Sequence, residues 1–241
     1  MPVERPVADW RDREGLERVP ALEPLEERAV KTGDRLSGGQ TVLWAPHPGP
    51  QTAFLQSTAH EALYGGMAGG GKSDALLYGA LRQVHHPKYR ALILRRTFPE
   101  LRELMDRALT TFAQTRGRWH EQSKRWTWPS GATVEFGYCA SYGDVMQYQG
   151  QEFCFIGFDE LGQVAEERVW TYLLSRNRAA AADLVLQMRA SANPGGPGHG
   201  WVKRRFVDVC TEPGRVYDVD GTTRAFFRSE EHTSELQSHG Y

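Results

Sequence analysis

The 241-residue sequence lacks several features that would assign it to a simple class of protein. It has only three cysteines, Cys139, Cys154 and Cys210, with no C-x-x-C pair. That argues against a disulfide framework, and we expect reduced thiols in a cytosolic protein. The longest strongly apolar run, FCFIGF (153–158), is far shorter than the ~20 residues of a membrane span. The charged N-terminus has no apolar signal-peptide core.

An excess of charge of one sign is absent as well. The chain has 29 basic and 30 acidic residues, for a net charge of -1. The whole molecule therefore has no electrostatic attraction to nucleic acid, and any such binding must come from a local patch. The length is sufficient to bury one good core. The sequence shows no internal repeat.

Apolar strand patterns alternate with helical patterns over most of the chain. Residues 1–45 are charged and punctuated by proline, and we interpret them as an N-terminal arm. Residues 46–227 predict an α/β domain with a mostly parallel central sheet and helices on both faces. The expected strands cover 90–96, 152–160 and 183–192, the expected helices 74–84, 99–113, 165–176 and a segment from 201, and the expected hairpin 124–138.

The segment from Arg228 to Tyr241 departs abruptly from this pattern and has no apolar face. Within it, RSEEHTSELQS resembles the in-frame translation of a common sequencing-adapter oligonucleotide. We therefore interpret residues 228–241 as a non-native tail and exclude them from the predicted fold.

A glycine-rich loop stands between a short apolar run and an amphipathic helix. The sequence GMAGGGKS (66–73) fits G-x-x-x-x-G-K-[ST] at every specified position. In such a loop, glycines let backbone N–H groups point at phosphate oxygens, and the helix N-terminus favours negative charge. The lysine is expected to contact the β- and γ-phosphates, and the serine hydroxyl to bind Mg²⁺. The candidate residues are Gly66, Gly69, Gly70, Gly71, Lys72 and Ser73.

Two further candidates follow predicted strands. The buried strand pattern FCFIGF ends in Asp159 and Glu160. Because the carboxyl ends of parallel strands face the ligand crevice, Asp159 is expected to hold Mg²⁺ and Glu160 to act as general base toward water. Asn193, which follows the strand pattern DLVLQMRASA, is a candidate for contacting the γ-phosphate, with Ser191 in support. A plain Asn-Pro turn is the alternative for Asn193.

These segments together resemble the large subunit of tailed-phage terminases. The similarity rests on YGGMAGGGKS, LRRTFPELR, YQGQEFCFIGFDEL, YLLSRNR and ANPGGPGHGWVKRRF, in this order, over residues 49–209. The resemblance implies a RecA-like, Mg²⁺-dependent ATPase that drives double-stranded viral DNA into a procapsid. It implies adenine recognition at Gln51 and a coupling role for SANPGG. The implied partners are the portal protein, the procapsid and the terminase small subunit, with copies of the chain forming a homo-oligomeric ring. The implied location is the host cytoplasm, and no membrane is involved.

The sequence departs from the family pattern in two ways. We expect no nuclease activity, because the family's C-terminal nuclease domain is absent, and Asp218 and Asp220 are too few acids to replace it. The phosphate loop also has no arginine, so we expect a neighbouring subunit to supply one. Arg176 and Arg178 are the first candidates for this catalytic role, and Arg95 and Arg96 the second.

Alternatives remain open from the residues alone. A helicase or repair translocase of the same class would share these motifs, and so would a truncated module that binds ATP without hydrolysing it. The segment RGRWHEQSKRWTW (116–128) mixes basic residues and tryptophans. A hairpin packed by its own tryptophans is favoured there over contact with DNA. Neither a zinc nor a calcium site is assigned.

Overall fold

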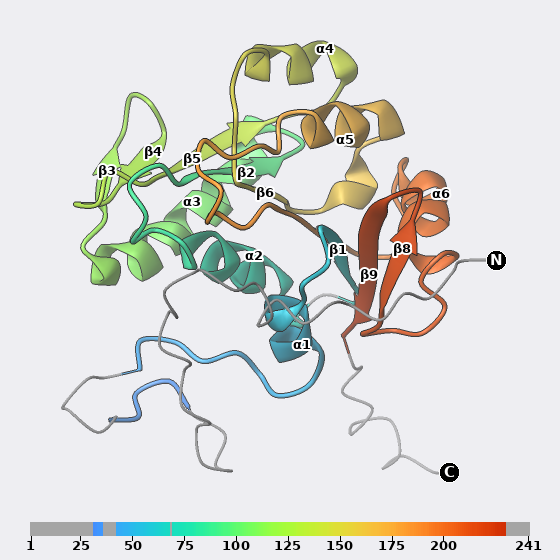
Figure 1. The fold of residues 1–241 in the computed structure, drawn as a ribbon, viewed down its shortest axis with the longest axis horizontal. Helices are drawn as coiled ribbons and strands as arrows, with labels where there is room; N and C mark the ends of the chain where they lie inside the picture. The colour runs from blue at the N-terminus through green and yellow to red at the C-terminus, as the bar shows by residue number, and fades with distance from the viewer. Residues whose placement is uncertain (1–30, 36–41, 68, 230–241) are drawn as a thin grey trace, which may run out of the picture.

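One sheet of nine strands organises residues 31–35, 42–67 and 69–229, the part of the chain that the structure, a computed structural model, describes. The strands lie side by side in the order β3-β4-β5-β2-β6-β7-β1-β9-β8 (Figure 1). Their bounds are β1 Glu61–Gly65, β2 Arg90–Arg95, β3 Arg118–His120, β4 Arg125–Thr127, β5 Thr133–Tyr138, β6 Phe155–Phe158, β7 Gln187–Ala192, β8 Val216–Val219 and β9 Thr222–Arg228.

The sheet is mostly parallel, as the sequence predicts. The six central strands, from β5 to β9 in spatial order, pair in parallel. Antiparallel pairs occur only at the two ends of the described sheet, where β4 and β3 extend one end and β8 extends the other. The predicted hairpin is confirmed as β4 and β5. The strands β3, β8 and β9 have no counterpart in the sequence analysis.

Helices cover both faces of the sheet (Figure 1). Apolar side chains of α2 and α3 pack on one face, and those of α4, α5 and α6 pack on the other. Strand β2 alternates accordingly, with Ala91 and Ile93 facing the first group and Leu92 and Leu94 the second. The helices are α1 Pro50–Gln56, α2 Lys72–Leu81, α3 Phe98–Phe112, α4 Tyr142–Val145, α5 Glu167–Leu174 and α6 His199–Val202, which continues as a π-helical segment over Lys203–Val207.

The aromatic hairpin packs as the favoured interpretation expects. Trp126 and Trp128 are 2% and 5% exposed, and both rings contact Phe112 of α3. Trp119 of β3 lies against Trp126, with ring centroids 5.7 Å apart. The tryptophans therefore fasten the end of the sheet to the helix beneath it.

The predicted N-terminal arm and C-terminal tail lie mostly outside the described residues. Most of the arm at 1–45 lies outside the described residues, but Trp44 stacks on Tyr78 of α2 with ring centroids 3.8 Å apart. Strand β9 includes Arg228, one residue beyond the predicted boundary at 227, and residues 230–241 lie outside the described part. No helix within the described ranges is long and apolar enough to cross a membrane.

Candidate active site

The glycine-rich loop connects the end of β1 to the start of α2, as predicted. All five residues of β1 are buried, so the strand gives the loop a fixed starting point. Gly66, Gly69 and Gly71 have φ angles of 134°, 91° and 65°, a region that L side chains rarely adopt. Gly71 is the N-cap of α2, which begins at Lys72. The sequence thus needs glycine at these positions to turn the chain directly into a helix.

Two side chains from outside the loop hold its far end. Gln51 of α1 is 2% exposed, and its Nε2 donates to the carbonyl oxygen of Gly71 at 2.8 Å. Its Oε1 accepts from the backbone N–H of His47 at 2.5 Å. The hydroxyl of Tyr64 donates to the carbonyl oxygen of Gly70 at 3.1 Å. Gln51 therefore lies directly against the phosphate loop, and its role in adenine recognition stays a prediction.

The lysine of the loop is folded back onto it. Lys72 is 8% exposed, and its Nζ donates to the carbonyl oxygen of Met67. Burial lowers the pKa of Lys72, while the nearby charges of Asp159 and Glu160 act in the opposite direction. An ammonium group that donates to a loop carbonyl, with the charges of two carboxylates nearby, is placed to meet an anion that enters the loop.

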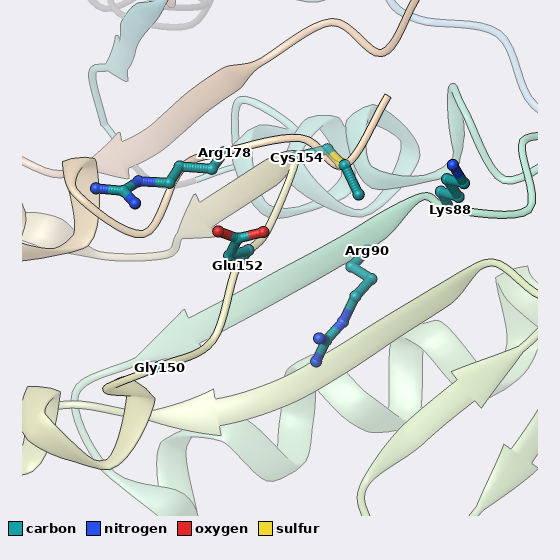
Figure 2. Close-up of a pocket in the computed structure, with 7 residues that line it drawn as sticks. Lys88, Arg90, Gly150, Glu152, Cys154 and Arg178 are labelled. Carbon is teal, nitrogen blue, oxygen red and sulfur yellow. The ribbon is translucent and has the colours of Figure 1, made fainter. Parts of the chain in front are cut away.

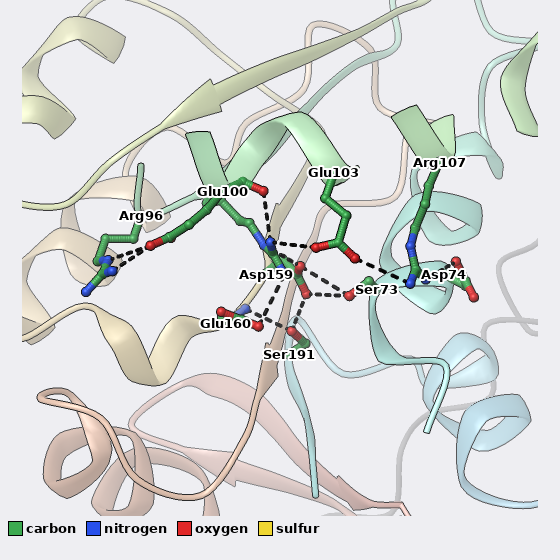
Figure 3. Close-up of polar contacts among 10 residues, drawn as sticks. Ser73, Asp74, Arg96, Glu100, Glu103, Arg107, Asp159, Glu160 and Ser191 are labelled. Carbon is green, nitrogen blue, oxygen red and sulfur yellow. Dashed lines mark hydrogen bonds and ion pairs between the residues drawn. The ribbon is translucent and has the colours of Figure 1, made fainter. Parts of the chain in front are cut away.

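The predicted acids lie beside the loop (Figure 3). Asp159 directly follows β6 and is 1% exposed. Its carboxylate accepts from the hydroxyl of Ser73, at 3.1 and 3.2 Å to its two oxygens, and from the hydroxyl of Ser191. The structure therefore brings together the two predicted Mg²⁺ ligands, Ser73 and Asp159. Ser191, which is predicted to support Asn193, contacts both residues of the acid pair.

Glu160 occupies an unusual backbone conformation. Its φ of 58° places it in the left-handed region, which is uncommon for a residue other than glycine. The backbone N–H of Glu160 donates to the Ser191 hydroxyl at 2.9 Å, which fixes this turn. Its side chain is 35% exposed, so the carboxylate stays accessible to solvent. A general base that must meet water needs this access.

Arg95, predicted only as a second candidate for the arginine from a neighbouring subunit, contacts both acids of its own chain. Its Nε donates to Asp159 at 2.8 Å, and its Nη2 donates to Glu160 at 3.2 Å. Burial disfavours the guanidinium charge, but the two carboxylates outweigh it and raise the pKa of Arg95. Arg95 thus lies in the site of its own chain. The sequence shows that Arg95 ends a predicted strand, but the pairing of β2 with β6, which brings it to the acids, comes from the structure.

Further ion pairs join this arginine to the helices around the loop (Figure 3). The Nη1 of Arg95 donates to the carbonyl oxygen of Glu100 at 2.8 Å and lies 3.8 Å from the carboxylate of Glu103. Arg107 lies 3.6 Å from Glu103 and 3.1 Å from Asp74 of α2. Arg96 instead pairs with Glu100, on the side away from the acid pair. The chain of contacts runs from the acids through α3 to the helix that follows the phosphate loop.

Asn193 is exposed and directly follows β7, at the same edge of the sheet as the acid pair. The glycine-rich segment after it packs against the turn that follows Glu160. There the backbone N–H of Gly198 donates to the carbonyl oxygen of Gly162 at 2.8 Å, and a Cβ on Gly196 would lie 2.5 Å from that same oxygen. The two segments are therefore in direct contact. The γ-phosphate contact of Asn193 stays a prediction.

Within one chain, the predicted arginines lie at the other end of β6 from this site. The expected helix 165–176 extends too far, because α5 ends at Leu174 and both Arg176 and Arg178 follow it. The backbone of Phe153, just before β6, is hydrogen-bonded to the backbone of both. Its N–H donates to the carbonyl oxygen of Arg176 at 2.9 Å, and its carbonyl oxygen accepts from the N–H of Arg178 at 3.0 Å. They therefore lie at the amino end of β6, whereas Asp159 lies at its carboxyl end. Arg178 lines a cleft there of about 190 Å³ (Figure 2).

The arrangement by itself defines a class of protein. A phosphate loop between β1 and α2, with an aspartate and a glutamate at the end of β6, is the layout of nucleotide-binding α/β domains. The family model described as terminase large subunit, T4likevirus-type, N-terminal, matches residues 63–201. That match covers more than half of the chain, and the chain belongs to the terminase large subunit family.

Solved structures agree on the fold. The large terminase of a thermophilic bacteriophage, in complex with ADP, is 17% identical, with a TM-score of 0.56, over 75% of this chain and 44% of that one. The large terminase ATPase domain of Thermus phage P74-26 is 19% identical, with a TM-score of 0.55, over 77% and 81%. The N-terminal domain of the DNA packaging ATPase of bacteriophage phi29 is 13% identical, with a TM-score of 0.53, over 78% and 97%. No curated protein matches the chain.

These likenesses confirm the predicted RecA-like α/β fold. The chain spans less than half of the length of the thermophilic-phage large terminase that it matches. The two neighbours that cover most of their own length are an isolated ATPase domain and an N-terminal domain.

Proposed function

We propose that this chain is an ATP-hydrolysing motor domain of a terminase large subunit, which drives double-stranded viral DNA into a procapsid. One observation carries the proposal: the phosphate loop, Ser73, Asp159 and Glu160 converge at one edge of the sheet. Family membership supports it, and so do structures of the thermophilic-phage large terminase with ADP and with ATP-gamma-S. The proposed partners are the portal protein, the procapsid, the terminase small subunit and neighbouring copies in a ring, in the host cytoplasm.

The residues fit a Mg²⁺–ATP complex. Mg²⁺ prefers oxygen ligands and usually takes only one or two from the protein, with phosphates and water supplying the rest. The hydroxyl of Ser73 and the carboxylate of Asp159 are such ligands, and they lie within hydrogen-bond distance of one another. When bound, the metal would neutralise charge on the phosphates. Lys72 would bind the phosphates, and the backbone N–H groups of the loop would hold them in place.

Glu160 is proposed to accept a proton from the attacking water. Its carboxylate is partly exposed beside the loop, while Ser191 fixes its backbone and Arg95 its side chain. These contacts position the base instead of taking part in proton transfer. Asn193, on the adjacent strand end, is proposed to contact the γ-phosphate and to report its loss to the SANPGG segment.

A phosphate-release assay with two variants tests this proposal. Glu160→Gln should leave ATP binding nearly intact and lower turnover by roughly 10²–10⁴-fold, the usual value of a positioned general base. Lys72→Ala should instead weaken binding of a fluorescent ATP analogue. Equal hydrolysis by Glu160→Gln and the unmodified chain would overturn the assignment of the base.

Two alternatives give different outcomes in the same assay. A chain that binds ATP but never releases phosphate, even with procapsids and portal present, would be a nucleotide-binding module and not a motor. Stimulation by DNA alone, with no response to procapsids and portal, would favour a helicase or another translocase.

A further inference from the structure

One end of the sheet has different residues on its two faces. The strand register aligns Arg118 of β3 with Thr127 of β4, Thr127 with Thr133 of β5, and Thr133 with Arg90 of β2. Residues that are aligned across neighbouring strands point to the same face of a sheet. These four side chains therefore form a row across the face opposite to α2 and α3.

A second row runs beside the first. His120 of β3 is aligned with Arg125 of β4, and Arg125 with Glu135 of β5. The alternate residues, Trp119 and Trp126, point to the other face and enter the core under α3. The segment that mixes arginines with tryptophans thus separates them, with the rings inside and the charges outside.

The outer face stays accessible within the described part of the chain. Arg118 and His120 are exposed, and the side chains of Arg125 and Arg90 are 40% and 43% exposed. Helices α4 and α5 lie on this side of the sheet but further along it, over β2 and β6 (Figure 1). We call Arg90, Arg118 and Arg125 the open basic face.

Positive charge exceeds negative charge on this face. Glu135 is shared by two arginines, at 3.2 Å from Arg90 and 3.6 Å from Arg125. The side chain of Arg118 has no hydrogen bond or ion pair with another described residue. Taken together, Glu135 and the three arginines of this face carry two positive charges in excess. The excess is local, because the whole chain is close to neutral.

The charge continues into the cleft at the amino ends of β2 and β6. Figure 2 shows Lys88, Arg90, Glu152 and Arg178 around this cleft, which has a volume of about 190 Å³. Three of these four side chains are basic. The open basic face is therefore one part of a longer basic strip along this end of the molecule.

We propose that the open basic face binds the sugar–phosphate backbone of duplex DNA. This inference rests on the proposed function, since it assigns a surface for the DNA that the motor would move. Each strand of duplex DNA carries one phosphate per ~3.4 Å of helix axis, so a basic row can meet several phosphates at once. Strands lie ~4.8 Å apart, so the row from Arg118 to Arg90 spans about 14 Å, or roughly four phosphates.

The residue types favour a phosphate backbone over an acidic peptide. Arginine presents a planar fork that binds phosphate oxygens in pairs, and its charge persists at any physiological pH. The strands hold these forks at fixed spacings, and a regular polymer of charge can match fixed spacings. The face also has no large apolar side chain among the described strand residues aligned with its arginines, so nothing on it anchors a folded protein partner.

Anisotropy of a labelled 30-base-pair duplex, measured from low to moderate salt, tests the proposal. The logarithm of the binding constant falls with the logarithm of salt concentration by ~0.9 for each phosphate neutralised. Arg118→Gln with Arg125→Gln should therefore weaken binding and reduce this slope by about 2. Arg118→Lys with Arg125→Lys should keep most of the slope, because the charge is retained.

The matched control is Arg215→Gln, an exposed arginine beside β8 at the other end of the sheet. It removes one positive charge, as Arg118→Gln alone does, and should leave both affinity and slope unchanged. Thermal melting checks that each variant folds. If the double variant does not fold, Arg118→Gln alone should reduce the slope by about 1.

Three outcomes would overturn the proposal: an unchanged slope in a folded double variant, an equal loss in the Arg215 control, or binding of labelled poly-glutamate as tight as that of DNA through the same arginines. ATP turnover measured in the same samples keeps the two proposals separate. DNA binding through this face without any hydrolysis would contradict the proposed motor function alone. Normal hydrolysis with DNA binding that is independent of these arginines would contradict this inference alone.

Discussion

Two buried carboxylates lie at opposite edges of the sheet, one at the carboxyl ends of the parallel strands and one at their amino ends. Both are paired with arginine. Asp159, 1% exposed, follows the carboxyl end of β6 and accepts from Arg95 and from the hydroxyls of Ser73 and Ser191. Glu61, fully buried, begins β1 at the amino end. The two groups have the same chemistry, but they differ in what else surrounds them.

In the described part of the chain, the side chains that donate hydrogen bonds to the Glu61 carboxylate are two arginines and a tryptophan. It accepts from Arg205 at 2.8 and 3.0 Å, from Arg224 at 3.0 Å and from the indole of Trp170 at 2.5 Å. Arg205 is further held by Glu167 at 3.0 Å. Each of these partners is a charged group or a ring fixed in the core. Asp159 instead has two neutral hydroxyls among its partners, which can give way to a cation. The difference fits a structural role for Glu61 and the proposed Mg²⁺-binding role for Asp159.

The largest expected effect concerns Arg176 and Arg178 at the amino end of β6, which are proposed to act on the acid site at the carboxyl end of β6 in a neighbouring subunit. Arg176→Ala or Arg178→Ala should lower turnover by roughly 10³–10⁵-fold, because an arginine that meets the γ-phosphate in the transition state has that value. ATP binding should persist. Mixed with the inactive Glu160→Gln chain, the arginine variant should recover part of its phosphate release, because its intact acid site can use the partner's arginine.

Two results would contradict this arrangement. Turnover per chain that does not depend on protein concentration would argue against a contribution from a neighbour. Full activity in both arginine variants would move the search to Arg96, since Arg95 already lies in the site of its own chain.

The next effect separates the two carboxylates by stability. Glu61→Gln should cost about 3–5 kcal/mol of unfolding free energy, because it leaves Arg224 without its counter-ion and Arg205 with Glu167 alone. Asp159→Asn should cost clearly less, because Arg95 keeps its ion pair with the partly exposed Glu160. Urea unfolding of both variants measures the difference. An equal loss would mean that Asp159 is as structural as Glu61.

The smallest effect is a dependence on pH. Burial alone would raise the pKa of Glu61, but Arg205, Trp170 and Arg224 outweigh burial and lower it from 4.5. The stability that Glu61 contributes is therefore fully present above about pH 4.5 and is lost as pH falls through the lower, folded-state value. The gap in stability between the unmodified chain and Glu61→Gln should narrow below about pH 4.5. A gap that stays constant down to pH 3 would contradict the assignment.

Local pattern predicted the centre of the site. The glycine-rich loop and the acid pair each lie within a few residues, and both follow strands whose apolar runs are unmistakable in sequence. The parallel sheet then brings Lys72, Ser73 and Asp159 together without further information. Physical chemistry sets residue type and spacing in such a segment, so the sequence is sufficient there.

Long-range pairing could not be predicted in the same way. Nothing local in Arg95 indicates that β2 lies beside β6, and therefore that its guanidinium meets Asp159. Glu61 and Arg224 are 163 residues apart, and their ion pair exists only because β1 and β9 are neighbours. The sequence predicts helix to residue 176, two residues past the end of α5 at Leu174, because YLLSRNR keeps a helical composition beyond the point where the apolar face ends.

The pairing of β1 also determines when the phosphate loop can be completed during synthesis. Both neighbours of β1 are distant in sequence, with Glu61 aligned to Met188 of β7 and to Arg224 of β9. Chains grow from the N-terminus, and pairings between distant strands form late and slowly. During synthesis, β1 therefore stays unpaired on one side until β7 has been made, and on the other side until β9 has been made. The loop is among the first structured segments to be made, yet its supporting strand is among the last to be enclosed.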